Sequence, residues 1–203
     1  TATVILIFGG AFLILILEYR NPGTLGNMPF WEKCMAAVFQ SVTCRTAGFF
    51  TIPQENLQEA SAMVCMILMF IGGSPLGTAG GVKTTTMAAL LLTGSSFFKG
   101  KEDTEVFNRR IPENNIRTAW VVLMLGLAVV LTSTIGLAIA TEGMEEGAYL
   151  INIMYEVTSA GATVGLSRGL TPLLPAAGKL IIILTMYIGR IGPTTLATAL
   201  TIH

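Results

Sequence analysis

The sequence predicts an all-α membrane protein built from two copies of one helical unit. Of its 203 residues, 52% are apolar and 12% are charged, and the mean hydropathy is +0.69. This balance leaves too few charges to cover the surface of a soluble domain. Four long apolar runs cross the chain, and the sequence aligns with itself at an offset of 117 residues. Together these observations indicate bilayer-spanning helices in a duplicated arrangement.

The apolar runs predict the membrane spans. They are residues 4–17, 61–71 continued by 82–98, 119–140, and 173–202. A bilayer core takes roughly 20 apolar residues per helix, so the third and fourth runs are long enough to span. The second is long enough only if its glycine-rich middle is included. The first begins almost at Thr1, and we expect the chain to be a piece of a longer one.

Two shorter apolar segments predict helices that do not cross the bilayer. Residues 31–42 and 147–158 have about a dozen residues each, too few to span, which is typical of re-entrant or interfacial helices. Each is followed by a stretch rich in small and hydroxyl-bearing residues. The order of span, short helix, polar loop and span therefore occurs twice.

The duplication is specific because it aligns glycines and polar residues as well as apolar ones. "MFIGG" aligns with "MYIGR" and "TAGF" with "TVGL", and no gap is needed. The aligned pairs are Thr46 with Thr163, Gly48 with Gly165, Met69 with Met186, Ile71 with Ile188, Gly72 with Gly189, and Thr78 with Thr195. We therefore divide the chain into one unit at 1–97, a connector at 98–116 and a second unit at 117–203.

Loop charges predict the orientation. Five bases lie between the second and third runs: Lys99, Lys101, Arg109, Arg110 and Arg117. The loop at 142–146 has three acids and no base. Because basic loops favour the cytoplasm, we expect the connector inside and the 142–146 loop outside. Both short helices then enter from the outside, and their loops lie partway down.

The polar loops at 43–49 and 161–166 are expected to line a cavity. Irregular backbone at membrane depth is tolerated only where it is buried in protein or faces water. Gly48 and Gly165 permit dihedrals that turn carbonyls to an axis, and Thr46 adds a hydroxyl. The C-terminus of a short helix also presents the negative end of its dipole, which favours a cation. The alternative is a re-entrant loop that plugs a helix bundle without conduction.

The sequence argues against an enzyme and against a nucleic-acid partner. "GTAGGVKT" lacks the glycine that precedes the lysine of a phosphate-binding loop. "GLSRG" matches a nucleophile elbow, but His203 is the only histidine and Asp103 the only aspartate. The three cysteines form no C-x-x-C pair, and the formal net charge of zero gives no nucleic-acid footprint.

Four segments of the chain resemble one family. "SVTCRTAGFF", "GGSPLGTAGGVKTTT", "EVTSAGATVGLSRG" and "MYIGRIGPTTLATAL" look like the third and fourth pore repeats of the Trk/Ktr/HKT superfamily of potassium transporters, in particular its KtrB and TrkH membrane subunits. The resemblance covers essentially the whole chain. It implies M1-P-M2 repeats (span, pore helix, filter loop, span) around a potassium-channel-like fourfold pore. It also implies that an N-terminal half with two further pore repeats is missing.

The resemblance implies a selectivity filter with one glycine per repeat. Potassium would be the substrate, held by the backbone carbonyls of Thr46, Ala47, Thr163 and Val164, with no covalent cofactor. Sodium is a candidate coupling ion for symport, and a filter without a second glycine predicts weaker sodium exclusion than in a channel. The filter residues would be Thr43, Cys44, Arg45, Thr46, Ala47, Gly48, Gly161, Ala162, Thr163, Val164 and Gly165.

The same resemblance implies a gate below the filter. Five glycines and a proline at 72–81 cannot sustain a helix, and the family uses this segment as an intramembrane gate. The gate residues would be Gly72, Gly73, Ser74, Gly77, Thr78, Gly80, Gly81, Lys83 and Arg190. We expect Arg190 to donate to carbonyls of this segment, the alternative being a helix-packing arginine. Arg45 is expected to point behind the filter toward a carboxylate, with Glu156 as the candidate.

The family also implies partners and a location. Its members pair as homodimers in the cell (plasma) membrane, are multi-pass, and sit on a cytosolic nucleotide-binding regulatory ring of the KtrA/TrkA kind. The connector is either a docking surface for that ring or a solvated linker. The rival interpretation is a secondary transporter of another solute, built from repeats with broken helices. Such repeats are often inverted, whereas here both short helices enter from one face.

Overall fold

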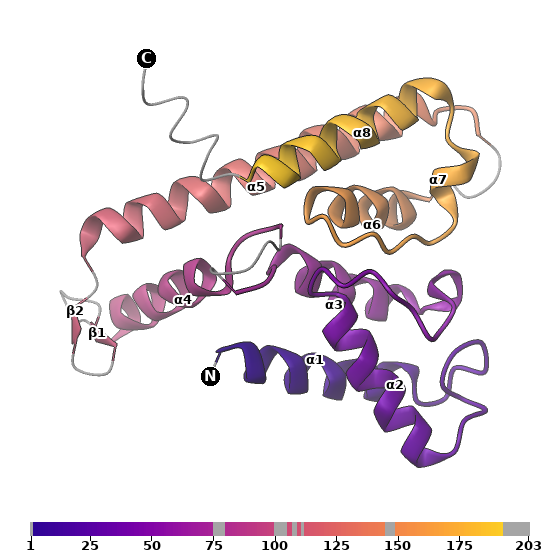
Figure 1. Ribbon diagram of the computed structural model, residues 1–203, viewed down its shortest axis with the longest axis horizontal. Coiled ribbons are helices and arrows are strands. Elements are labelled where there is room, and N and C mark those ends of the chain that lie inside the picture. The colour runs from indigo at the N-terminus through magenta and orange to yellow at the C-terminus, as the bar shows by residue number, and fades with distance from the viewer. Residues whose placement is uncertain are drawn as a thin grey trace.

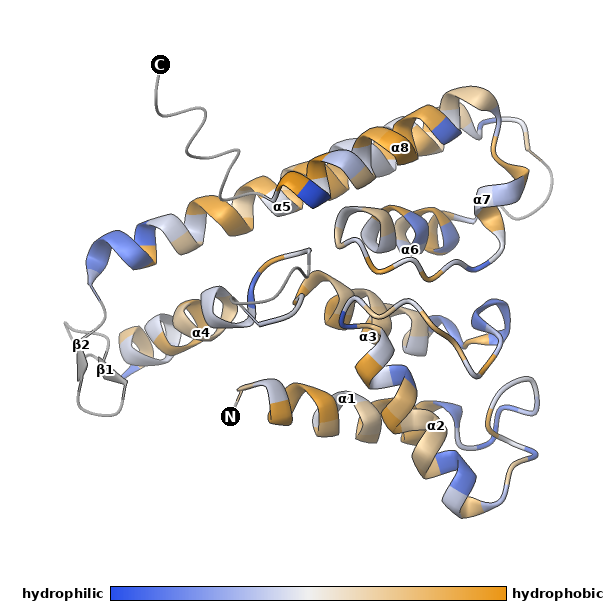
Figure 2. Cartoon of the chain, viewed as in Figure 1, coloured by the Kyte–Doolittle hydropathy of each residue, from blue (hydrophilic) through white to orange (hydrophobic). Residues whose placement is uncertain are grey.

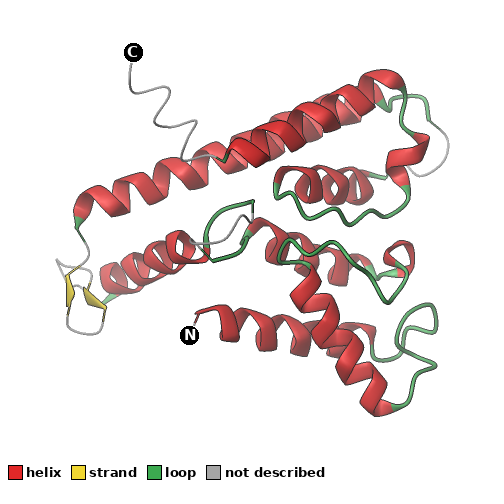
Figure 3. Ribbon diagram, viewed as in Figure 1, coloured by secondary structure: helices red, strands yellow, loops and turns green. Residues whose placement is uncertain are grey.

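The structure is a computed structural model that describes residues 2–74, 80–99, 105–106, 109–110, 112–144 and 149–192. These residues are helical apart from loops and one short antiparallel ladder, in which β1 (Glu105–Val106) pairs with β2 (Arg109–Arg110). The predicted helical fold class is confirmed, while the ladder in the connector was not foreseen. Figure 1 shows the arrangement, and Figure 3 shows how little of it is strand.

The first unit packs three helices together. α1 (Ala2–Glu18) lies against both α2 (Phe30–Thr43) and α3 (Glu59–Phe70). A 3-10 turn, η1 (Gln54–Asn56), precedes α3. The predicted interruption of the second span is present, because the chain leaves helix after α3 and resumes it only at α4 (Thr84–Phe98).

The second unit repeats this order around α6 (Leu150–Gly161). α6 packs against α5 (Glu113–Ala140) and α8 (Ala176–Ile191), and its other side contacts α3 of the first unit. Figure 1 shows α6 between the α5 and α8 pair and α3. A hydrophobic core joins the units here, and it includes Met69 from α3 and Tyr155 from α6.

The 117-residue offset also relates details of the two backbones. α3 begins at Glu59 and α8 begins at Ala176, which are equivalent positions. Among non-glycine residues that the structure describes, only Thr46 (φ 69°) and Thr163 (φ 55°) have positive φ, and these too are equivalent. The duplication therefore extends to an uncommon local conformation.

α8 occupies the middle of the last apolar run. We expected one span over 173–202, but prolines break its start, so that α7 (Leu170–Leu173) ends before Pro175 and α8 follows. α8 ends at Ile191, because Gly192 has φ 83° and ψ 143° and precedes a proline, which disfavours helix in the residue before it. Residues 193–203 lie outside the described part of the chain.

The surface of the long helices is apolar. Among the described residues, α5 alone is long and apolar enough to cross a membrane by itself, and 17% of its most apolar window is buried. α1 and α3 are shorter apolar helices. Figure 2 shows hydrophobic residues along most of α1, α5 and α8, with hydrophilic residues gathered in loops and at the α5 end near the β1–β2 ladder. Exposed Leu127, Leu131 and Ile135 give α5 an outer face suited to lipid.

Candidate functional site

Two loops that follow α2 and α6 meet between the units. We call residues 44–49 the first loop and residues 162–166 the second loop. A Cβ atom built on Gly48 would lie 2.3 Å from the Val164 carbonyl oxygen and 3.8 Å from the Cα of Gly165. The loops are therefore in direct backbone contact, and glycine at position 48 leaves room for it.

Both loops have the same uncommon backbone conformation. Thr46 and Gly48 have φ of 69° and 78°, and Thr163 and Gly165 have φ of 55° and 92°. Ala47, which lies between the first pair, is not in this left-handed region. Positive φ at a β-branched threonine is a genuine outlier, at a cost of about 1 to 3 kcal/mol. Such strain is typical of functional sites, and alternating φ allows neighbouring carbonyls to face one side.

The helix ends hold the loops directly. Ala47 N–H and Gly48 N–H both donate to the carbonyl of Thr43, at 3.2 and 3.4 Å. In the second loop the Val164 N–H donates to the Ser159 carbonyl at 2.9 Å. Each loop thus sits on the C-terminal end of a short helix, where the partial negative charge of the helix dipole lies.

The predicted filter residues fall into two groups by burial. Thr43, Cys44 and Ala162 are buried, and the Thr43 hydroxyl donates to the Phe49 carbonyl, which braces the first loop from behind. Thr46 and Thr163 are half-buried and Ala47 is exposed. α6 extends three residues beyond its predicted end at Thr158, so Gly161 is the last helical residue rather than part of the loop.

The two ends of the interruption after α3 lie against each other and under the second loop. A Cβ on Gly72 would lie 2.0 Å from the Gly80 carbonyl oxygen. One on Gly80 would lie 2.4 Å from Thr163 Oγ1 and 2.7 Å from the Ala162 carbonyl oxygen. The predicted gate residues Gly77 and Thr78 lie outside the described part of the chain. The remaining segment is in contact with the second loop and leaves no space for side chains at these glycines.

The predicted pairing of Arg45 with Glu156 is wrong. The guanidinium of Arg45 donates to the carbonyls of Thr3 (3.1 Å) and Gly72 (3.3 Å). The interruption after α3 leaves the Gly72 carbonyl free of helix bonding, so a backbone oxygen replaces the expected carboxylate. The carboxylate of Glu156 instead accepts bonds from residues that follow the second loop.

Arg190 lies on a cavity beside the second loop. The cavity has a volume of about 480 Å³, and Thr163, Val164, Gly165 and Glu156 are among its lining residues. The predicted donation from Arg190 to the 72–81 segment stays a prediction.

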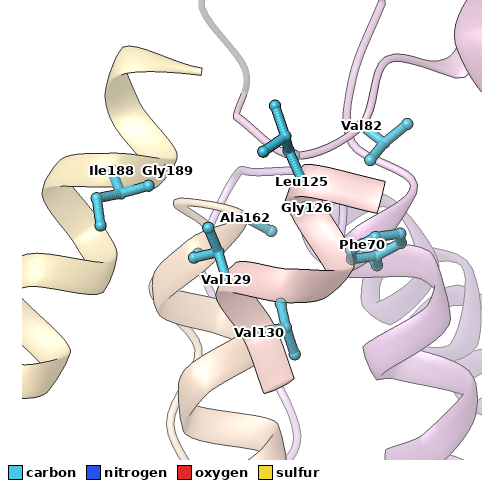
Figure 4. Close-up of a pocket in the computed structure, with 11 residues that line it drawn as sticks. Phe70, Val82, Leu125, Gly126, Val129, Val130, Ala162, Ile188 and Gly189 are labelled. Atoms are coloured by element: carbon cyan, nitrogen blue, oxygen red, sulfur yellow. The ribbon is translucent and has the colours of Figure 1, made fainter. Parts of the chain in front are cut away.

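A smaller apolar cavity of about 40 Å³ lies where α3, α5, α6 and α8 converge. Figure 4 shows Phe70 and Val82 on one side of it and Val129, Val130 and Ala162 on the other. Nearby, a Cβ on Gly189 would lie 2.1 Å from the Gly161 carbonyl oxygen. Gly189 is equivalent to Gly72, so both units use this position for a close backbone approach.

Sequence reasoning missed the polar contacts that join the units. Arg168 reaches carbonyls at residues 54–57, and the Tyr155 hydroxyl donates to Gln54 Oε1 at 2.9 Å. A polar residue in a buried short helix, such as Tyr155 in α6, indicates that a polar contact exists, but the sequence does not indicate which residue is its partner.

Comparisons with known proteins give one consistent result. The family model for TrkH, described as a cation transport protein, matches residues 2–203. The Ktr system potassium uptake protein B of Bacillus subtilis (strain 168) is 40% identical over 195 residues, covering 96% of this chain and 43% of that protein. The potassium/sodium uptake protein NtpJ of Enterococcus hirae is 40% identical over 200 residues, covering 98% of this chain and 44% of that protein.

A solved structure agrees in fold. The crystal structure of the potassium transporter TrkH from Vibrio parahaemolyticus matches with a TM-score of 0.73 at 21% identity, over 98% of this chain and 42% of that one. The chain thus spans less than half the length of these proteins.

Proposed function

The chain belongs to the TrkH family of cation transport proteins, and from this we propose that its two loops form part of a potassium-selective pore. Transport families of this kind work in membranes, so the chain is a membrane protein, and its relatives are named as ion uptake proteins rather than enzymes. The observation that carries the proposal is the contact of Gly48 with the Val164 carbonyl between two loops of matching conformation.

We propose that each unit is an M1-P-M2 repeat and that the loops are filters. α2 and α6 are the pore helices, and the carbonyls of Thr46, Ala47, Thr163 and Val164 replace water around a potassium ion. Three features support this: the positive φ at alternate positions, the helix C-termini at the loops and the contact between the loops. The other predicted filter residues support these carbonyls from behind.

The segment after α3 is proposed as the gate. Gly80 is packed under Thr163 and Ala162, so a displacement of this segment would open or obstruct the path directly below the second loop. Arg190 lines the adjacent cavity and is proposed to stabilise the closed position. Arg45 ties the first loop to Gly72, which gives the gate a contact with each loop.

A pore needs further repeats, and α2 shows where one would pack. α6 contacts α3 of the preceding unit, whereas one face of α2 is exposed. Trp31 is 72% exposed and Met35 58% exposed on that face, which borders a groove of about 490 Å³. We propose that the span of a preceding repeat covers this groove. Relatives more than twice as long as this chain leave room for two such repeats.

The whole protein is then proposed to take up potassium across the cell membrane, with the connector inside. Its further partners would be a second copy of itself and a cytosolic nucleotide-binding ring, and sodium is the candidate coupling ion. NtpJ of Enterococcus hirae, named as a potassium/sodium uptake protein, supports testing sodium as well as potassium. A secondary transporter of another solute is the alternative function.

The test is ion flux through the full-length protein in lipid vesicles. Potassium and sodium gradients of equal size are imposed in turn, and uptake is followed with and without a membrane potential. We expect potassium to follow its electrochemical gradient, with sodium entering more slowly. Potassium uptake that requires a fixed stoichiometry of another solute would favour the alternative, and absence of potassium flux would refute the proposal.

A further inference from the structure

Arg168 connects the backbone that follows the second loop to the backbone that follows the first. It comes three residues after Gly165, and its guanidinium crosses to the first unit. There Nε donates to the Gln54 carbonyl at 3.2 Å, and Nη2 donates to the carbonyls of Leu57 at 3.0 Å and Glu55 at 3.4 Å. One side chain thus bonds to three carbonyls in and just after η1.

Arg168 is itself held in place within the second unit. Its backbone N–H donates to Glu156 Oε1 at 2.9 Å. The same carboxylate accepts the hydroxyls of Ser167 and Thr171, each at 2.6 Å, and Glu156 is 4% exposed. Bonds to a buried charge are stronger than neutral ones, so Arg168 has little freedom to follow a moving partner.

A second connection runs parallel to the first. The Tyr155 hydroxyl of α6 and the Gln40 amide of α2 both donate to Gln54 Oε1, at 2.9 and 2.7 Å, and Gln54 Nε2 donates back to Gln40 Oε1 at 3.1 Å. All three side chains are buried. The two short helices that carry the loops are therefore bonded to the same turn that Arg168 holds.

This network joins the two units whose loops touch. The loops touch at Gly48 and the Val164 carbonyl, so a shift of either unit relative to the other changes the separation of their carbonyls. A filter distinguishes ions through the placement and number of its carbonyls. We propose that Arg168 is a positioning residue that holds the two filter loops at the separation needed to prefer potassium over sodium, an inference that rests on the proposed function.

The experiment compares ion preference in full-length variants. The potassium-to-sodium flux ratio is measured in vesicles for the unaltered protein, Arg168→Gln, Arg168→Lys and a control, Arg117→Gln, which changes an exposed arginine at the start of α5. Losing bonds from a charged donor should lower the ratio about tenfold in Arg168→Gln. Arg168→Lys should lower it too, because an ammonium group cannot reproduce the planar fork of a guanidinium. Arg117→Gln should leave it unchanged.

The outcomes separate positioning from charge and from the proposed function. An unchanged ratio in Arg168→Lys would overturn the inference, because charge alone would then suffice. If Arg168→Gln fails to assemble, as judged by size-exclusion chromatography, Arg168→Lys alone decides, and an unchanged ratio in it overturns the inference. No potassium flux in the unaltered protein would instead refute the proposed function.

Discussion

Replacing Gly48 by alanine should impair ion preference more than the same change at any other glycine of the loops. The new Cβ would lie 2.3 Å from the Val164 carbonyl oxygen, whereas ordinary contacts begin at 3.4 Å. Because an overpacked site relieves its clash by a backbone shift, the two loops must move apart by about 1 Å. Overpacking costs about 1 to 3 kcal/mol. Alanine at φ 78° costs about 1 to 2 kcal/mol more.

A displacement of that size exceeds the difference in radius between potassium and sodium ions. A widened filter should lose its better fit to potassium, so we expect the potassium-to-sodium flux ratio to fall by about tenfold, which corresponds to about 1.4 kcal/mol of lost preference. Potassium and sodium uptake by the full-length protein in vesicles measures this directly. The affected step is ion selection, so the variant should still assemble.

Two matched substitutions separate the causes. Gly165→Ala has φ 92° but nothing within 4 Å of the new Cβ, so it carries the backbone strain alone and should have a smaller effect. Gly94→Ala lies in α4, also with nothing within 4 Å, and should leave the ratio unchanged. If Gly48→Ala and Gly94→Ala had the same potassium-to-sodium flux ratio, the reasoning from loop contact would be refuted.

Two further predictions concern the gate and the packing of α8. Arg45→Gln removes the guanidinium bonds to the Thr3 and Gly72 carbonyls, each contributing about 1.5 to 3 kcal/mol. Potassium leak without any cytosolic partner should therefore rise, and an unaltered leak would contradict a role for Arg45 at the gate. Gly189→Ala places a Cβ 2.1 Å from the Gly161 carbonyl oxygen. This should reduce the free energy of unfolding by about 1 to 3 kcal/mol and so lower the midpoint of thermal unfolding. Its control, Gly136→Ala, meets only the flexible end of Ile181 at 3.4 Å, and equal midpoints for the two variants would argue against close packing at Gly189.

Much of the fold could be predicted because the helices follow from apolar runs and their breaks. α1, α2 and the interruption after α3 fall where the runs and glycines place them. The end of α8 was missed although its signal, Gly192 before a proline, is in the sequence, because the apolar run continues past it.

The site was harder to predict where backbone atoms are the partners. The expected partner of Arg45 was a carboxylate, as buried charges usually require, but its guanidinium donates to two backbone carbonyls instead, that of Thr3 in α1 and that of Gly72 after α3. The positive φ of Thr46 and Thr163 runs against the preference of threonine. Arg168 lay within a mismatched enzyme motif and a family-like segment, but neither predicted its role, since a contact across more than 100 residues leaves no local pattern.

The two copies lie on one polypeptide, so a substitution can change a position in one copy and leave the equivalent position in the other copy unchanged. The position equivalent to Arg168 in the first copy is Thr51, and the one equivalent to Glu156 is Phe39. In a channel assembled from identical subunits a guanidinium at this place would recur around the whole mouth and repel every approaching cation. Because the two copies lie in tandem on one chain, Arg168 ties them together while its counterpart in the first copy, Thr51, carries no charge.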